Sequence, residues 1–410
     1  MTPYVRNRLY TLLVAAGSLA PTIGHAELFN LSVSANGQTY TTSFDDAEDS
    51  IQAAAADAIS EKITAFDENT DSAQIVLDYR GLDMQLAYGS NSTSLEFQVA
   101  SLGINKTFAG ATRSESNDQL VDFLKSDGGD LLNRIMKELA AVSPTDPIAG
   151  NPASLMSMEA ASLFDSATQG TSLANKEAQS DVNQVDFNIR FSNYQVDEED
   201  VQQLHLPLSY TVNIDGKPGH QLHFKLPLSY TKVNSSAESY GIGLGIGYTF
   251  PVNGQLSFTP GVSYAAIGSV NQGAAAAVQT LSLSTKYDFS FMDQEWRFGN
   301  TLARMSTAEV KFDDYEIDPN LTNHVMVNGL QWRSVPIEDI NLDLFVTDTR
   351  FFGDELYSER TDEIGFSIAS ENLMPDSVNK TGLRFRVGGS YLVADRSDIN
   401  GFRINMGASF

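Results

Sequence analysis

The sequence predicts a transmembrane antiparallel β-barrel of about 12 strands, preceded by a small α+β N-terminal domain and a helical segment. Residues 186–410 contain one segment after another in which apolar residues stand at every second position. The final segment, 400–410, alternates in this way up to Phe410. Strands of ~9–11 residues that are apolar toward lipid and polar toward a lumen build membrane barrels. Downstream of residue 26, no run reaches the ~18 apolar residues of a membrane helix.

Residues 1–26 have the three parts of a secretory signal peptide. Arg6 and Arg8 make its first part basic, residues 9–20 are largely apolar, and Gly24-His25-Ala26 offers small residues for cleavage. The apolar run is too short to cross a membrane, so we expect removal rather than anchoring. The expected division of the chain is then 1–26 signal peptide, 27–142 N-terminal domain, 143–185 linker and helix, and 186–410 barrel.

The charge balance and the cysteine count exclude several classes of function. The chain has 52 acidic and 26 basic residues and a formal net charge of −26, which argues against binding nucleic acid through its phosphates. It has 0 cysteines, so disulfides, thiolate nucleophiles and zinc–sulfur sites are excluded. We expect no cofactor and no metal site.

Residues 27–142 are expected to form a small mixed domain with one core. Asn36-Gly37 lies between two alternating runs, 29–35 and 39–44, which predicts a β-hairpin. Asp45-Asp46 can cap a single helix over 47–66. The other expected elements are short strands at 74–79, 83–88, 94–100 and 103–108, a helix around Leu120 and Phe123, and a helix from Asp130 to Leu139.

Residues 143–185 are expected to join the two domains. The segment 143–152 contains three prolines and a glycine, which is typical of a linker. In 153–168, apolar residues including Leu155 and Phe164 have the spacing of one helix face. Because this predicted helix precedes the first barrel strand, it is a candidate plug for the pore.

The barrel prediction rests on twelve alternating segments. They are 186–194, 202–213, 221–231, 239–250, 254–265, 278–289, 295–307, 323–333, 339–350, 362–370, 381–393 and 400–410. The second and third share the string LPLSYT, and the alternation slips in the seventh and eighth, which suggests β-bulges. A soluble β-sandwich also gives alternating strands. Aromatic residues at the segment ends favour the membrane barrel, where they form interfacial girdles.

Loop lengths predict the orientation of the barrel. With both ends of the barrel domain in the periplasm, the even-numbered connections are short turns and several odd-numbered connections are long and acidic, such as 197–200 and 313–316. Short periplasmic turns and longer outer loops are the usual arrangement. Carboxylates in these loops could bridge through divalent cations to lipopolysaccharide, but ordinary solvated loops are the simpler interpretation. The side of the membrane that residues 27–142 occupy stays open.

One strand of the predicted barrel has a lumen face made of glycine. Gly241, Gly243, Gly245 and Gly247 alternate with aliphatic residues within 239–250. Glycine inside a strand often marks the close approach of another element, which favours contact with a plug. The alternative is that these glycines relieve curvature of the wall.

Five cations fall in the polar phase of their strands and are expected to line the lumen. They are Arg190, Lys225, Arg384, Arg386 and Arg403. In a partly desolvated lumen they need anionic partners. The candidate partners are Asp343 and acids of the preceding segment, namely Glu159, Asp165, Glu177 and Asp181. An anion-preferring pore would use the same five cations, but we favour internal pairing.

Catalysis finds little support in the sequence, and no catalytic residue is assigned. Four histidines lie downstream of the signal peptide: His205, His220, His223 and His324. A hydrolase site at the barrel rim could be assembled around one of them, but no nucleophile motif such as G-x-S-x-G accompanies them. We therefore expect no enzyme.

In architecture the chain resembles the translocator domains of bacterial autotransporters, and more closely the solitary outer-membrane autotransporter-like barrels. Two segments, 122–130 (DFLKSDGGD) and 143–152 (SPTDPIAGNP), add to this resemblance. The chain departs from autotransporters in having no β-helical passenger and no Asn-Asn pair before the first strand, so secretion of a passenger is not expected.

The resemblance implies location in the outer membrane of a Gram-negative bacterium, as a monomer surrounded by lipid and lipopolysaccharide. It also implies that Phe410 is the residue read by the barrel assembly machinery. The expected role is structural or translocator-like, with the pore occluded by the segment before the first strand. A small-solute or anion-preferring channel is the first alternative, and a rim hydrolase is the second.

Overall fold

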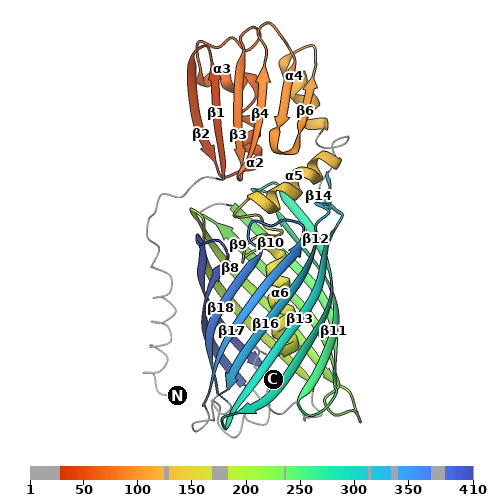
Figure 1. Ribbon diagram of the computed structural model, residues 1–410. Helices are drawn as coiled ribbons and strands as arrows, with labels where there is room; N and C mark the ends of the chain where they lie inside the picture. The colour runs from red at the N-terminus through yellow and green to blue at the C-terminus, as the bar shows by residue number, and fades with distance from the viewer. Residues whose placement is uncertain are drawn as a thin grey trace, which may run out of the picture.

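The computed structural model describes residues 28–123, 129–168, 183–234, 237–312, 315–333, 340–370 and 384–409. The predicted signal peptide, Glu177, Asp181 and Phe410 lie outside these residues. Twelve strands form a closed barrel with a separate domain above one end (Figure 1). The barrel strands are β7 (Gln184–Val196), β8 (Glu199–Asn213), β9 (Gln221–Val233), β10 (Ala237–Pro251), β11 (Leu256–Ser269), β12 (Ala274–Phe291), β13 (Gln294–Ala308), β16 (Thr322–Arg333), β17 (Ile340–Gly353), β18 (Arg360–Ser370), β19 (Arg384–Ala394) and β20 (Ile399–Ser409).

The barrel closes because its last strand pairs with its first. Each strand pairs antiparallel with its sequence neighbours, and β20 pairs with β7 from Ile399↔Val196 to Ser409↔Asp186. Alternation places one set of side chains on the outer wall, where Ile242 is 56% and Leu244 is 65% exposed although both are apolar. The predicted antiparallel barrel of twelve strands is therefore confirmed.

The predicted bulges are absent, and prolines interrupt the hydrogen-bond ladder instead. β13 and β16 pair residue for residue from Glu295↔Arg333 to Ser306↔Thr322. Pro207 and Pro227, from the two LPLSYT copies, lie opposite each other in β8 and β9. Proline has no N–H to donate, so the ladders from β8 to β7 and from β9 to β10 lapse at these positions without a change of register.

The N-terminal domain is a six-stranded sheet in the order β2-β1-β3-β4-β5-β6, with helices against it. The two strands of the expected hairpin, β1 and β2, are joined at Asn36-Gly37. A short β14–β15 hairpin lies in the connection between β13 and β16. The elements are β1 (Phe29–Ala35), β2 (Gln38–Phe44), α2 (Ala47–Gln52), α3 (Ala56–Lys62), β3 (Ala73–Tyr79), β4 (Leu82–Tyr88), β5 (Leu95–Val99), η1 (Ala100–Leu102), β6 (Ile104–Phe108), α4 (Arg113–Asp122), β14 (Val310–Phe312) and β15 (Tyr315–Ile317).

The single helix predicted over 47–66 is wrong. Asp46 caps α2 by accepting hydrogen bonds from the backbone N–H groups of Glu48 and Asp49, but the chain breaks before α3 begins. Ala54 and Ile59 are both buried. On one continuous helix these two residues would lie about 140° apart, so the break lets both of them face the core.

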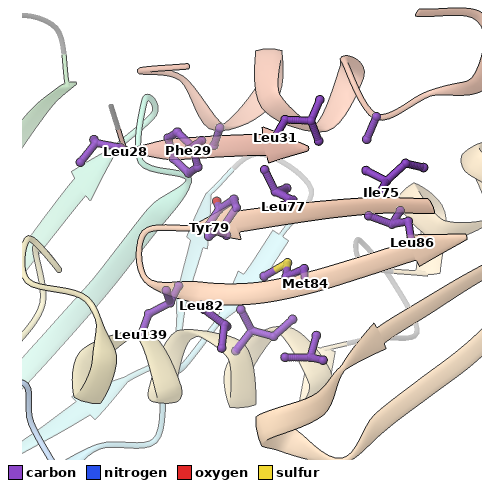
Figure 2. Close-up of a cluster of buried hydrophobic side chains, with 14 of the residues drawn as sticks. Leu28, Phe29, Leu31, Ile75, Leu77, Tyr79, Leu82, Met84, Leu86 and Leu139 are labelled. Carbon is purple, nitrogen blue, oxygen red and sulfur yellow. The ribbon is translucent and has the colours of Figure 1, made fainter. Parts of the chain in front are cut away.

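One face of the sheet carries the core of the domain. Leu31, Ile75, Leu77 and Leu86 point to the same side, and Leu139 approaches from α5 (Gly129–Val142) (Figure 2). The same hydrophobic cluster continues without a break into the barrel rim. Its members there include Val196, Val201, Val233, Ala237, Ala274, Ala275, Tyr357, Leu392 and Ile399. Apolar burial thus fixes the domain to one end of the barrel.

The segment 143–152, predicted as a linker, is instead one of the most buried stretches of the chain. Only Pro144 among these residues is even partly exposed. Gly150 has φ +87°, and a Cβ there would lie 2.6 Å from the carbonyl oxygen of Ala140. The backbone N–H of Tyr357 donates to Ala140 (2.8 Å), and that of Ser358 donates to Gly150 (3.0 Å). Proline and glycine serve here to fit a tight junction rather than to provide slack.

Polar contacts complete the junction between domain and barrel. Arg80, in the β3–β4 turn, forms a fully buried ion pair with Asp146 at 3.4 Å. The Lys137 ammonium of α5 lies 2.6 Å from the carboxylate of Asp354 in the β17–β18 loop. Burial raises the pKa of the Asp146 carboxyl group, and the nearby Arg80 charge opposes that rise.

Within the described residues, no helix is long and apolar enough to cross a membrane.

Replacing Arg80 with methionine is expected to loosen this junction. Asp146 would stay buried without its cation, which costs about 3–5 kcal/mol for such pairs. We expect amide hydrogen exchange in residues 143–154 to accelerate, and the double variant with Asp146→Asn to recover part of the protection. The pKa of the Asp146 carboxyl group is raised in the folded state, so the free energy of unfolding falls as the pH rises through that pKa. The Arg80→Met defect should therefore be larger at pH 8 than at pH 5, and a pH-independent defect would contradict this account.

Candidate functional site

Helix α6 (Leu155–Thr168) lies inside the barrel, where it runs along the wall formed by β11, β12, β13 and β16 (Figure 1). Its apolar residues Met156 and Leu163 are buried. The facing wall is made of small or slender side chains such as Ala276, Val278 and Ala303, which are also buried. These small residues leave room for the helix, and larger wall residues such as Ile267, Met305 and Phe351 belong to the same hydrophobic cluster. The alanine run of β12 is a sequence signal for this contact that our prediction did not use.

Polar groups hold the helix and the segment before it to the wall. Glu159 of α6 accepts a hydrogen bond from the Ser263 hydroxyl on β11 at 2.7 Å. Asp165 pairs with Arg190 of β7, whose Nε also donates to the Asn405 side chain of β20 at 3.0 Å. At the upper end, the Gln203 amide donates to the carbonyl oxygen of Ala153 at 2.8 Å. These contacts come from three parts of the wall, so the helix is fixed in position and rotation.

The four predicted glycines face inward but differ in what they accommodate. A Cβ on Gly243 would meet Pro227 (2.9 Å), Ala265 (3.1 Å) and the Glu159 carboxylate of α6 (3.4 Å). Gly241 and Gly245 meet residues of neighbouring strands instead, and Gly247 meets Thr259 and Pro260 of β11. Of the four, only Gly243 has α6 among its nearest atoms. The nearest atoms of the other three belong to neighbouring strands of the wall.

The closest glycine contact with the helix was missed by the sequence reasoning. A Cβ on Gly329 of β16 would lie only 2.4 Å from the Phe164 ring of α6. Gly329 is a single glycine in an otherwise ordinary strand, so no pattern marks it. The Phe164 ring thus packs against β16 rather than against the glycine-rich strand β10.

The predicted lumen cations separate into pairs across the wall. Arg386 of β19 pairs with Asp343 of β17 at 3.0 Å, and both side chains are buried. Arg403 of β20 pairs with Glu363 of β18 at 2.7 Å and donates to the Tyr194 hydroxyl at 2.9 Å. Each pair spans two strand spacings, about 10 Å, which long arginine side chains can bridge. Glu363 was not among the expected partners.

The remaining two predicted cations are placed differently. Lys225 of β9 lies close enough to Glu159 and Asp165 for their charges to act on it. Arg384 begins β19, and its side chain lies outside the described residues.

A second cationic group, at the end of the barrel away from the N-terminal domain, was not predicted. Arg297 of β13 makes a two-point contact with Asp288 of β12, at 2.6 and 3.0 Å. Lys286 and Arg333 line the same hollow, which has a volume of about 690 Å³. By contrast, two cavities beside α6 hold only about 70 and 50 Å³, room for a few water molecules.

In the described parts of the chain, the four histidines lie in separate settings. His223 bridges the hydroxyls of Thr211 (3.1 Å) and Thr249 (2.8 Å) inside the barrel. His220 contacts the Tyr248 hydroxyl at 2.9 Å near one rim. His205 is buried and His324 lies on the outer wall. The hydrogen bonds of His220 and His223 go to hydroxyl groups and satisfy the rings structurally.

No protein-family model matches the chain, and no curated protein matches it. Among solved structures, the chain is similar to the translocator domain of the autotransporter NalP from Neisseria meningitidis, at 12% identity and a TM-score of 0.43, with 62% of this chain and 97% of that one covered. The chain is also similar to the β domain of the Bordetella autotransporter Brka, at 13% identity and a TM-score of 0.40, with 56% of this chain and 99% of that one covered. A third similar structure is the KdgM porin in complex with disordered oligogalacturonate, at 10% identity and a TM-score of 0.32, with 55% of this chain and 98% of that one covered. At these values the likenesses carry no conclusion about activity.

The closed barrel of twelve strands has the fold that the sequence resemblance implied. A helix that precedes the first strand lies within it.

Changing Gly329 to alanine is expected to disturb the seat of Phe164. Overpacking of this kind costs about 1–3 kcal/mol, so the temperature at which the folded barrel converts to the unfolded gel band should fall. In a Phe164→Ala background the same glycine change should lower this temperature little further, because the colliding ring is already absent. Gly268→Ala is the matched control, since a Cβ there meets nothing within 4 Å. Equal effects of the two glycine variants would show that α6 does not lie against β16.

Proposed function

We propose that this protein is an outer-membrane barrel of autotransporter type that threads its own lumen and holds its N-terminal domain at the cell surface. The observation that carries the proposal is the path of the chain. It leaves a domain packed on one end of the barrel, passes down the lumen as α6, and enters β7 at the other end. Its role is structural rather than catalytic.

The outer wall supports a membrane location. Large apolar side chains are exposed all around it, a surface that a water-soluble protein of this size does not tolerate. They include Phe191, Ile242, Leu244, Val262, Leu281, Leu302, Leu344, Ile364, Val387 and Phe402. Aromatic pairs lie toward both ends of the wall, such as Tyr230 with Tyr240 and Phe250 with Phe258. Lipid contact between two aromatic bands is the environment that this pattern matches.

The orientation that we propose takes both ends of the barrel domain as periplasmic, as the sequence resemblance does. The lengths of the connections do not distinguish the two ends, because 309–321 is the longest beside the N-terminal domain and 371–383 is equally long at the opposite end. β7 begins and β20 ends at the end of the barrel away from the N-terminal domain. On this assignment the N-terminal domain is extracellular, and β7 begins and β20 ends on the periplasmic side. The chain is then an anchor with its own displayed domain, and no passenger needs to be released.

Occlusion of the pore is the second part of this proposal. It is supported by helix α6, which lies inside the barrel, and by the buried segment 143–152 at the end of the barrel that meets the N-terminal domain. A channel is the second candidate function, favoured by the hollow of about 690 Å³ with Lys286, Arg297 and Arg333 at the periplasmic mouth. Cations at a pore mouth select anions. The two candidates differ in whether ions can pass α6.

Planar-bilayer recordings of the full-length protein separate the two functions. We expect the unmodified protein to be nearly silent, and Glu159→Ala with Asp165→Ala to produce frequent openings, because both polar anchors of α6 are then lost. Ser157→Ala on the same helix is the control and should stay silent. A variant lacking residues 153–184 should conduct continuously. Equal large currents from unmodified protein and variants would contradict occlusion and favour the channel.

A further inference from the structure

A broad hollow lies on the outer wall of the barrel, across β7 to β13. Its volume is about 1120 Å³, somewhat larger than typical pockets that bind small molecules. Apolar side chains dominate its lining. Since a membrane barrel presents this wall to lipid, the hollow is a site within the bilayer rather than in water.

The hollow follows the cross-strand pairing. One side of it is a row of directly paired neighbours on successive strands. That row is Tyr210, Phe224, Ile246, Val262, Leu281 and Arg304. Because barrel strands are tilted, a row across them slants from the periplasmic end at β8 toward the outer end at β13. The hollow is therefore a long apolar groove with a direction.

The wall beneath the groove is thin. Gly245 and Ser263 line both the groove and the small cavity beside α6. Gly245 has no side chain and Ser263 turns its hydroxyl inward to Glu159, while Pro227 removes the ladder hydrogen bond beside them. At these two positions the backbone and small inward-facing side chains separate the groove from the cavity beside α6.

The outer end of the groove is polar and carries a cation. Arg304 is exposed on the lipid-facing wall, with Gln279 and Ser306 beside it in the groove lining. Its cross-strand neighbours are Leu281 and the exposed His324. Among the described residues, no acidic group pairs with Arg304. The other arginines of the outer wall are different, because Arg350 and Arg360 both contact Asp348, at 2.9 and 2.8 Å.

An unpaired arginine on a lipid face is costly at the bilayer centre, about 2–4 kcal/mol, and the cost falls toward the headgroups. Arg304 lies near the end of β13 that meets the N-terminal domain, so its long side chain can reach the outer headgroup layer. A phosphate there would supply the missing anion through a charge-assisted hydrogen bond. The groove below it would take acyl chains.

We propose that this groove is a specific site for a phosphorylated, multiply acylated lipid of the outer leaflet, namely the lipid A portion of lipopolysaccharide. Arg304 binds a phosphate, with Gln279 and Ser306 as neighbouring polar groups, and acyl chains lie along the row from Leu281 to Phe224. The direction of the groove, and with it the choice of an outer-leaflet lipid, rests on the proposed orientation of the barrel. The chemistry of the site, phosphate at one end and acyl chains at the other, does not.

Native mass spectrometry of the full-length protein in detergent tests the site independently of membrane orientation. The probes are bisphosphorylated lipid A, the same lipid without phosphates, and phosphatidylglycerol. We expect the phosphorylated lipid A to be retained about tenfold better than its dephosphorylated form, the effect of one charge-assisted hydrogen bond. Arg304→Gln should remove that preference. Val262→Trp, which fills the groove, should weaken retention of both lipid A forms.

Two matched variants serve as controls. Leu344→Trp changes an equally lipid-facing residue outside the groove, and Lys232→Gln removes another cation near the outer rim. Both should bind lipid A as the unmodified protein does. The proposal is overturned if Arg304→Gln keeps the preference for the phosphorylated lipid, or if Leu344→Trp weakens binding as much as Val262→Trp. It is also overturned if phosphatidylglycerol binds as well as phosphorylated lipid A, or if the groove variants abolish a dimer instead of lipid binding. A surface-topology experiment that failed would leave these outcomes unaffected.

Discussion

The passage of the chain through its own barrel is the constraint on which the rest of the structure depends. Once α6 lies in the lumen, the domain before it and the strand after it must be at opposite ends of the barrel. The wall must leave room for a helix, which accounts for the buried alanines of β12 and for Gly243 and Gly329. The lumen must also be electrically balanced around it, since unpaired buried charges are costly.

The charged side chains of the lumen meet that requirement by pairing across the wall or onto the helix. Arg386 with Asp343 and Arg403 with Glu363 fill the side of the lumen away from the helix contact. Arg190 with Asp165 ties the end of α6 to the strands on either side of the barrel closure. These contacts couple the helix to the seam where β20 meets β7.

The sequence anticipated the barrel well because lipid imposes a two-residue period that nothing else in the chain obscures. All twelve predicted segments overlap the observed strands. The hairpin of β1 and β2 was equally predictable, since Asn36-Gly37 is a sequence signal for a tight turn. The junction 143–152 was misread because proline and glycine mark both loose linkers and tight buried turns, and only tertiary contacts separate the two.

The contacts of the lumen were predictable in kind but not in partner. The phase of each strand shows that Arg386 and Arg403 point inward. Their partners lie two strands away, a relation that depends on stagger and curvature, so Glu363 could not be singled out. Gly329 was missed for a similar reason. Its importance comes from a ring on α6 that the strand pattern does not reveal. The glycine-rich strand β10 drew attention by its repetition, although only one of its four glycines has the helix among its nearest atoms.

The position of the N-terminal domain relative to the membrane tests the proposed surface display most directly. The chain has 0 cysteines, so single cysteines can be introduced without background. Thr41 is exposed on the N-terminal domain, and Lys217 is exposed on the turn at the opposite end of the barrel. With a membrane-impermeant maleimide on intact cells, Thr41→Cys should be labelled and Lys217→Cys should be labelled only after lysis. Labelling of Lys217→Cys but not Thr41→Cys on intact cells would contradict the proposed display of the domain at the cell surface.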